Sequence, residues 1–86
     1  VLIDGLVKSS ATGDPIRGII VSISDKKQYE YTDIEGKFSF YTESADIKVI
    51  KFQDIDSIQN GAFINKDTIL MNVYRQVYLD VFLENK

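Results

Sequence analysis

The chain has 86 residues and a formal net charge of −3, and 44% of its residues are hydrophobic, enough for the core of one small domain. No apolar run reaches the roughly 20 residues that a membrane-spanning helix needs. The acidic balance argues against a nucleic-acid partner, because phosphate binding needs clustered Lys and Arg. The chain has no Cys and no His. Disulfides, thiolate catalysis and zinc-thiolate sites are therefore excluded, and the commonest general base is missing.

Apolar and polar residues alternate with a period of two in a series of short segments, which is the pattern of half-buried β-strands. In chain order, we expect strands over residues 1–8, 18–25, 28–32, 37–42, 46–52, 68–74 and 76–84. The segment 46–52 carries apolar residues on both faces, so it is either buried on both sides or interrupted by a bulge. Apolar residues recur at helical spacing nowhere over a dozen positions, and only a short helical turn within 56–60 stays open.

The clearest turn lies between the third and fourth of these segments. Asp33 and Gly36 bracket it, because Asp can accept a backbone N–H and Gly can take a positive φ. Asp33 and Glu35 could also be read as a catalytic carboxylate pair. We favour the turn, because an exposed turn tip offers neither burial nor a like-charge partner to shift a pKa.

Seven short strands with turns every 8–12 residues predict an all-β fold, a seven-stranded antiparallel β-sandwich in one domain over 1–86. Gly5 lies inside the first strand, which it weakens unless a neighbour packs closely over it. The residues that we expect in one core are Val7, Ile19, Val21, Ile23, Phe38, Phe40, Ile69, Met71, Leu79 and Val81.

Four motifs of the first half occur in a specific order and spacing: Gly5-Leu-Val7, Thr12-Gly-Asp-Pro-Ile16, Gly18-Ile-Ile-Val-Ser-Ile23 and Thr32-Asp-x-x-Gly-Lys-Phe38. Together they resemble the carboxypeptidase regulatory-like, or transthyretin-like, domain. The resemblance implies a prealbumin-like sandwich with Greek-key connections.

The second half contains Val49-Ile-Lys-Phe-Gln-Asp-Ile-Asp56, followed by Asn60-Gly-Ala-Phe63 and Lys66. These residues are similar to a subgroup found in lipoproteins of gut anaerobic bacteria. The similarity implies an exported domain at the periplasm or cell surface. Its only link to the membrane would be a lipid on a Cys upstream of Val1.

Asp54, Asp56 and Asn60 form the one cluster of hard oxygen ligands that could surround a cation, and they resemble the start of a calcium loop. The loop lacks Gly at its sixth position and a bidentate Glu at its twelfth. We therefore favour a polar loop whose side chains bind its own backbone, with calcium as the alternative. No other cofactor and no catalytic residue is predicted.

Several aromatic residues are expected to point outward, namely Tyr29 or Tyr31, Tyr41, Tyr78 and Phe82. They could form a surface for sugar stacking or partner binding, or they could simply stabilise the sheets. We expect a non-catalytic structural or interaction module whose partner is a protein or a surface glycan. The alternatives are the N-terminal extension of an outer-membrane nutrient transport system and a carbohydrate-binding accessory domain.

Overall fold

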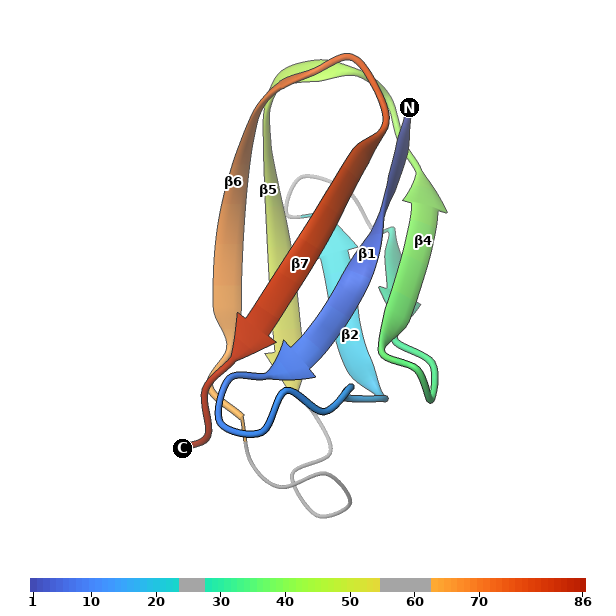
Figure 1. Ribbon diagram of the computed structural model, residues 1–86. Helices are drawn as coiled ribbons and strands as arrows, with labels where there is room; N and C mark the ends of the chain where they lie inside the picture. Colours follow the sequence, from blue (N-terminus) through green and yellow to red (C-terminus); the bar gives the residue numbers. More distant parts are fainter. Residues whose placement is uncertain (24–27, 55–62) are drawn as a thin grey trace.

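Two β-sheets packed face to face make up the fold, as the computed structural model of residues 1–23, 28–54 and 63–86 shows (Figure 1). The strands are β1 (Leu2–Ser9), β2 (Ile19–Ile23), β3 (Tyr29–Tyr31), β4 (Lys37–Tyr41), β5 (Ala45–Asp54), β6 (Lys66–Val73) and β7 (Val77–Leu83). The seven strands match the predicted segments closely. In the described part of the chain, no helix has the length and apolarity needed to cross a membrane.

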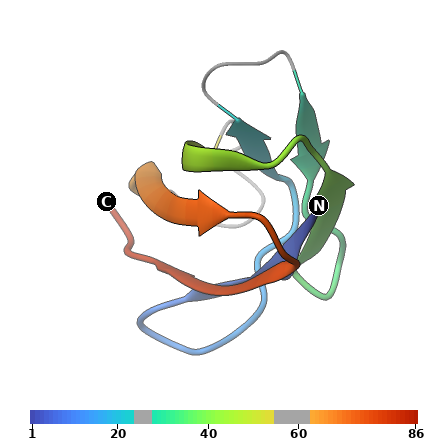
Figure 2. The ribbon, with the colours of Figure 1, turned by 90° about the horizontal axis from the view of Figure 1, so that it is seen from above.

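The sheets contain three strands in the order β4-β1-β7 and four strands in the order β3-β2-β5-β6. Seen from above, they form two layers with the core between them (Figure 2). All strand pairs are antiparallel except β1 with β7, which are parallel. The prediction of a purely antiparallel sandwich is therefore wrong at this pair. β7 enters its sheet by crossing from the end of β6 and not through a hairpin with β1, and a period of two carries no information on strand direction.

The core lies between the two sheets, where alternate side chains of both point inward. Most of the predicted core residues are buried there, namely Val7, Ile19, Val21, Ile23, Phe38, Phe40 and Val81, while Leu79 is half-buried against them. The rings of Phe38 on β4 and Phe52 on β5 meet edge to face, with their centroids 5.7 Å apart. This contact joins the two sheets through the middle of the core.

The prediction that Ile69 and Met71 on β6 lie in the core was wrong, because each is 66% exposed. The neighbouring Leu70 packs against the core instead. The cause is Asn72, whose φ of 55° lies in the left-handed region and reverses the side to which the next residue points. Val73 is therefore fully buried although Met71 and Ile69 are exposed. A prediction that assumes strict alternation from Val73 back along β6 assigns Met71 and Ile69 to the core, which is the wrong face.

The ambiguous segment in β5 is also resolved. Ile50 and Phe52 point into the core together with the buried Lys48, whereas Ile47 is exposed and Val49 is half-buried on the outer face. The pairing with β6 continues in one register from Ile47 to Phe52. The segment is therefore neither bulged nor buried on both sides.

Candidate binding groove

An open hollow of about 560 Å³ lies on the surface between β3, an edge strand of the four-stranded sheet, and the strands of the three-stranded sheet. It is lined by Asp4 on β1, Glu30 and Tyr31 on β3, Lys37 on β4 and Tyr78 on β7, and Gly5, Leu6, Asp33, Phe38 and Ser39 complete the lining. We call it the tyrosine groove. Its volume is within the range of sites for small ligands. Because its walls come from four strands, only the folded chain brings these side chains together.

The register of the three-stranded sheet explains how the floor of the groove is built. Asp4 pairs with Ser39 on β4 and with Tyr78 on β7, so these three side chains form one row across the outer face. The next row places Leu6 between Lys37 and Asp80. The rows alternate because every second residue of a strand points to the same face.

Thr32 anchors the wall that carries Tyr31. Its buried hydroxyl accepts the Ile19 N–H at 3.0 Å and donates to the Ile16 carbonyl at 2.7 Å. Its backbone N–H donates to the Ile19 carbonyl and its carbonyl accepts the Gly18 N–H. Tyr31 is therefore followed directly by a residue whose backbone and side chain are both held by hydrogen bonds.

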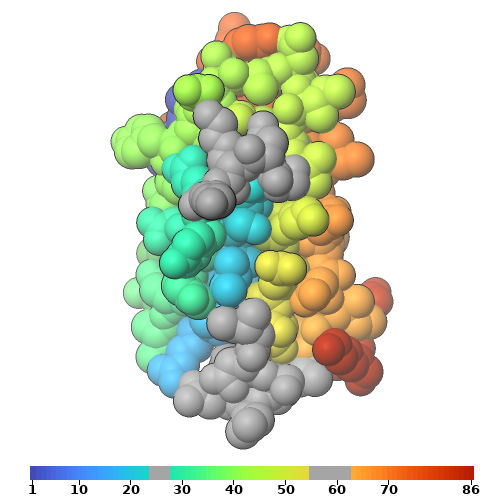
Figure 3. All heavy atoms as spheres, turned by 180° about the vertical axis from the view of Figure 1, so that it is seen from behind, coloured from blue at the N-terminus to red at the C-terminus, as the bar shows by residue number. Residues whose placement is uncertain are grey.

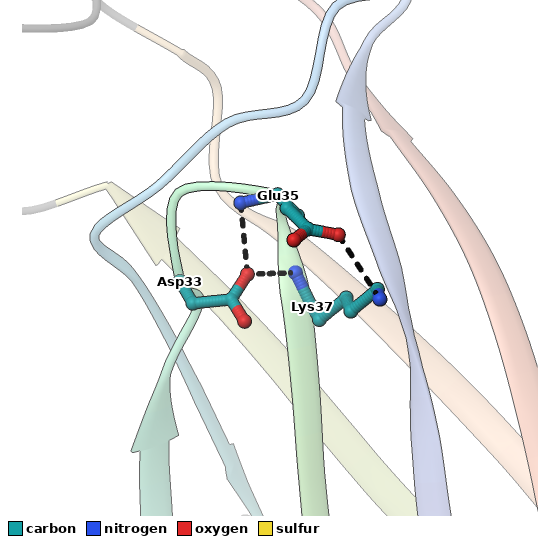
Figure 4. A network of polar contacts seen from close by, with 3 residues as sticks. All are labelled: Asp33, Glu35 and Lys37. Atoms are coloured by element: carbon teal, nitrogen blue, oxygen red, sulfur yellow. Dashed lines mark hydrogen bonds and ion pairs between the residues drawn. The ribbon is translucent and has the colours of Figure 1, made fainter.

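The turn at Asp33 holds the other wall and confirms the prediction of turn chemistry (Figure 4). One carboxylate oxygen of Asp33 accepts the N–H groups of Glu35 and Lys37, both at 2.9 Å. The Gly36 N–H donates to the Asp33 carbonyl at 2.9 Å, and Gly36 has a φ of 75°. Such a φ strongly favours glycine, so the residues at both ends of the turn are those that its geometry requires.

Lys37 brings a positive charge to the groove. Its ammonium group lies 3.0 Å from the Glu35 carboxylate. This contact raises the pKa of Lys37 above its ordinary value, and the nearby Asp33 and Tyr78 act in the same direction. Lys37 therefore stays a cation and a hydrogen-bond donor beside Tyr78.

Asp4 and Glu30 supply the acceptors. Asp4 receives a long contact of 3.5 Å from the Gln76 side-chain amide. Among the residues that the structure describes, neither carboxylate forms an ion pair. The groove thus combines acceptors and a donor with two tyrosine side chains that are 51% and 56% exposed. This set can form hydrogen bonds to a polar ligand and stack rings against its apolar face.

The predicted outward aromatics are all exposed, but they do not form one surface. Tyr31 and Tyr78 line the groove, and Tyr29 packs its ring edge to face on Tyr31 with the centroids 5.8 Å apart. Tyr41 and Phe82 do not line the groove. The positions of Asp4 and Glu30 in the groove were missed, because no local pattern indicates that β3 of one sheet lies beside the outer face of the other sheet.

The predicted calcium loop is described only in part. The Asp54 carboxylate accepts the Phe63 N–H at 2.9 Å, and the Asp54 N–H donates to the Asn65 side chain at 3.1 Å. Asp56 and Asn60 lie outside the described residues. Within 1–23, 28–54 and 63–86, no three acidic side chains group closely enough to hold a metal ion. The calcium site stays a prediction.

Comparison of the chain with protein-family models and with curated proteins gave no match. The interpretation of the tyrosine groove therefore depends on its own residues.

Proposed function

We propose that the chain is a non-catalytic interaction module and that its tyrosine groove binds a surface glycan. The observation that carries this proposal is the position of two exposed tyrosines, Tyr31 and Tyr78, on one open groove beside Asp4, Glu30 and Lys37. A sugar ring has an apolar C–H face and a rim of hydroxyl groups. Tyrosine rings match the first, and carboxylates and an ammonium group match the second.

A neutral polyhydroxylated ligand suits this groove better than a protein segment. Hydroxyl groups both donate and accept, so they can use the carboxylates and the ammonium group together. The groove is also open to solvent, as expected for a site that receives part of a longer chain and does not enclose a small molecule. No cofactor and no catalytic residue is assigned to it.

We propose further that the sandwich is of the prealbumin type, with Greek-key connections, and belongs to an exported protein that a lipid anchors at the periplasm or cell surface. The order of motifs in the first half supports this, from Gly5-Leu-Val7 to Thr32-Asp-x-x-Gly-Lys-Phe38. The seven strands in two packed sheets support it as well.

Binding of the chain to an array of neutral and charged glycans tests the groove. Tyr31→Ala and Tyr78→Ala are each expected to weaken binding at least about fivefold, because truncated aromatic anchors typically cost more than about 1 kcal/mol. Tyr41→Ala is the matched control: Tyr41 is 74% exposed on β4 but does not line the groove. Equal losses in all three variants would contradict the assignment, and so would binding to a cationic peptide but to no glycan.

A further inference from the structure

A second surface stands apart from the groove, on the outer face of the four-stranded sheet (Figure 3). β5 contributes Ile47, Val49 and Lys51 there, and β6 contributes Asp67, Ile69 and Met71. We call these six residues the β5–β6 face. Ile47, Ile69 and Met71 are 57%, 66% and 66% exposed. Adjacent exposed aliphatic side chains of this kind mark interaction surfaces in soluble proteins.

The face consists of three cross-strand pairs at successive levels. Ile47 pairs with Met71, Val49 with Ile69, and Lys51 with Asp67. Each level therefore has one side chain from each strand, and the two strands carry matched types. At two levels both side chains are aliphatic, and at the third they carry opposite charges.

We propose that a second copy of this chain packs on the β5–β6 face, about a two-fold axis parallel to the strands between β5 and β6. Rotation about such an axis places β5 of one copy over β6 of the other, and each cross-strand pair lies over the same pair of the partner. Val49 then faces the partner's Ile69, and Ile47 faces the partner's Met71. The contact is isologous, because one surface fits itself. Packed sheets cross at about 30°, so the strands of each copy are turned by half of that angle from the axis, and the side chains nearest the axis make the closest contact.

The charges identify both the occupant and the axis. About this axis, Lys51 faces the partner's Asp67, and the symmetric contact repeats it. Among the residues that the structure describes, neither Lys51 nor Asp67 forms an ion pair, so both charges are available. A two-fold axis across the strands at the middle level would instead place Lys51 over the partner's Ile47. Self-packing about the parallel axis therefore avoids burying a charge against an aliphatic side chain.

The face is small, with six residues on each side where stable complexes use about 20–30. We therefore expect a reversible dimer that forms only at high protein concentration. Sedimentation over a concentration series, from micromolar to millimolar, measures its dissociation constant. Lys51→Asp and Asp67→Lys should each weaken association at least tenfold, because each sets like charges against each other twice.

The decisive experiment mixes these two variants in equal amounts. One variant is acidic at both positions and the other is basic at both, so only the mixed dimer has complementary charges. Association in the mixture should return to at least the level of the unmodified chain. Repulsion within each chain cannot be relieved by mixing, so recovery identifies a contact between copies. Lys8→Asp, on the outer face of the other sheet, should leave association unchanged.

Two results would overturn the proposal. One is the absence of concentration-dependent association up to millimolar protein. The other is association that Lys51→Asp or Asp67→Lys reduces but that mixing does not restore. Neither result bears on glycan binding, because the tyrosine groove lies on other residues.

Discussion

At the scale of single residues, Gly5 explains how β1 and β7 can pair so closely. A Cβ atom at this position would overlap the Leu79 carbonyl oxygen and lie 2.9 Å from the carbonyl carbon. These are backbone atoms of the paired strand, so no side-chain rotation relieves the overlap. The condition that makes a glycine useful within a strand, a closely packed neighbour, is met here.

We therefore expect Gly5→Ala to lower the free energy of unfolding by roughly 3 kcal/mol, the upper end of the usual cost of overpacking. Gly13→Ala is the control. Gly13, unlike Gly5, has a positive φ, 77°, and nothing lies within 4 Å of an added Cβ. It should cost only about 1–2 kcal/mol of backbone strain. Urea unfolding of both variants compares them, and an equal loss would contradict the role given to Leu79.

A second residue-scale prediction concerns Tyr74, whose hydroxyl donates to the Asp46 carboxylate. This hydrogen bond raises the pKa of Tyr74 above its ordinary value of 10.0. A raised pKa means that the contribution to stability is complete below the unfolded pKa and disappears as the pH rises through the folded pKa. The contact should therefore stabilise the fold at neutral pH and be lost in alkaline solution.

Tyr74→Phe removes the hydroxyl and tests this. The stability difference between the unmodified chain and the variant should be constant from pH 7 to about 9 and shrink above about pH 10. Urea unfolding at each pH measures it. Lys37, whose pKa is also raised, loses its proton and its interaction with Glu35 in alkaline solution in both proteins. Its contribution to stability therefore cancels in the difference. A difference that grows with pH would show the sign to be wrong.

At the scale of strands, two neighbouring residues of β6 point to opposite faces of the sheet. Leu70 packs against the core, whereas Ile69 is 66% exposed. In dilute protein, Leu70→Ala should cost about 2 kcal/mol, the low end for a leucine in a core. Ile69→Ala should stay within about 0.5 kcal/mol, as is usual at the surface. Thermal unfolding compares them, and the reverse order would mean that β6 presents its other face.

The segment after β5 gives a prediction about metal. The Asp54 carboxylate already accepts the Phe63 N–H, so it holds the backbone at Phe63. We expect the thermal midpoint to be the same in calcium and in chelator. A weak site would instead raise it by several degrees, since ligand at about 10–100 Kd stabilises by about 1.4–2.7 kcal/mol. A calcium-dependent rise that disappears in Asp56→Asn, with magnesium inert, would establish the calcium site.

At the scale of the molecule, the first and last strands lie side by side. β1 pairs with β7 from Ile3 and Val77 to Ser9 and Leu83, so the sheet is complete only when both ends of the chain are in place. Contacts between distant segments cost loop entropy before they stabilise the fold. We expect refolding in milliseconds to seconds, measured by stopped-flow fluorescence of the tyrosines, and refolding in microseconds would contradict this.

The sequence by itself determined the local features of this protein. Alternation with a period of two located all seven strands, and Asp33 and Gly36 located the tight turn, because both signals depend on residues a few positions apart. The buried faces of β2 and β4 also followed from alternation. In these strands the backbone is regular, so each second residue points to the same side.

The tertiary structure alone decided three other features. Asn72 reverses the face of β6, which no count of apolar residues reveals, because the reversal depends on a backbone angle. The direction of β7 beside β1 depends on how the chain crosses between the sheets. The tyrosine groove depends on β3 of one sheet lying beside β4, β1 and β7 of the other. These features arise from contacts between distant segments, and local sequence patterns do not encode which distant segments meet.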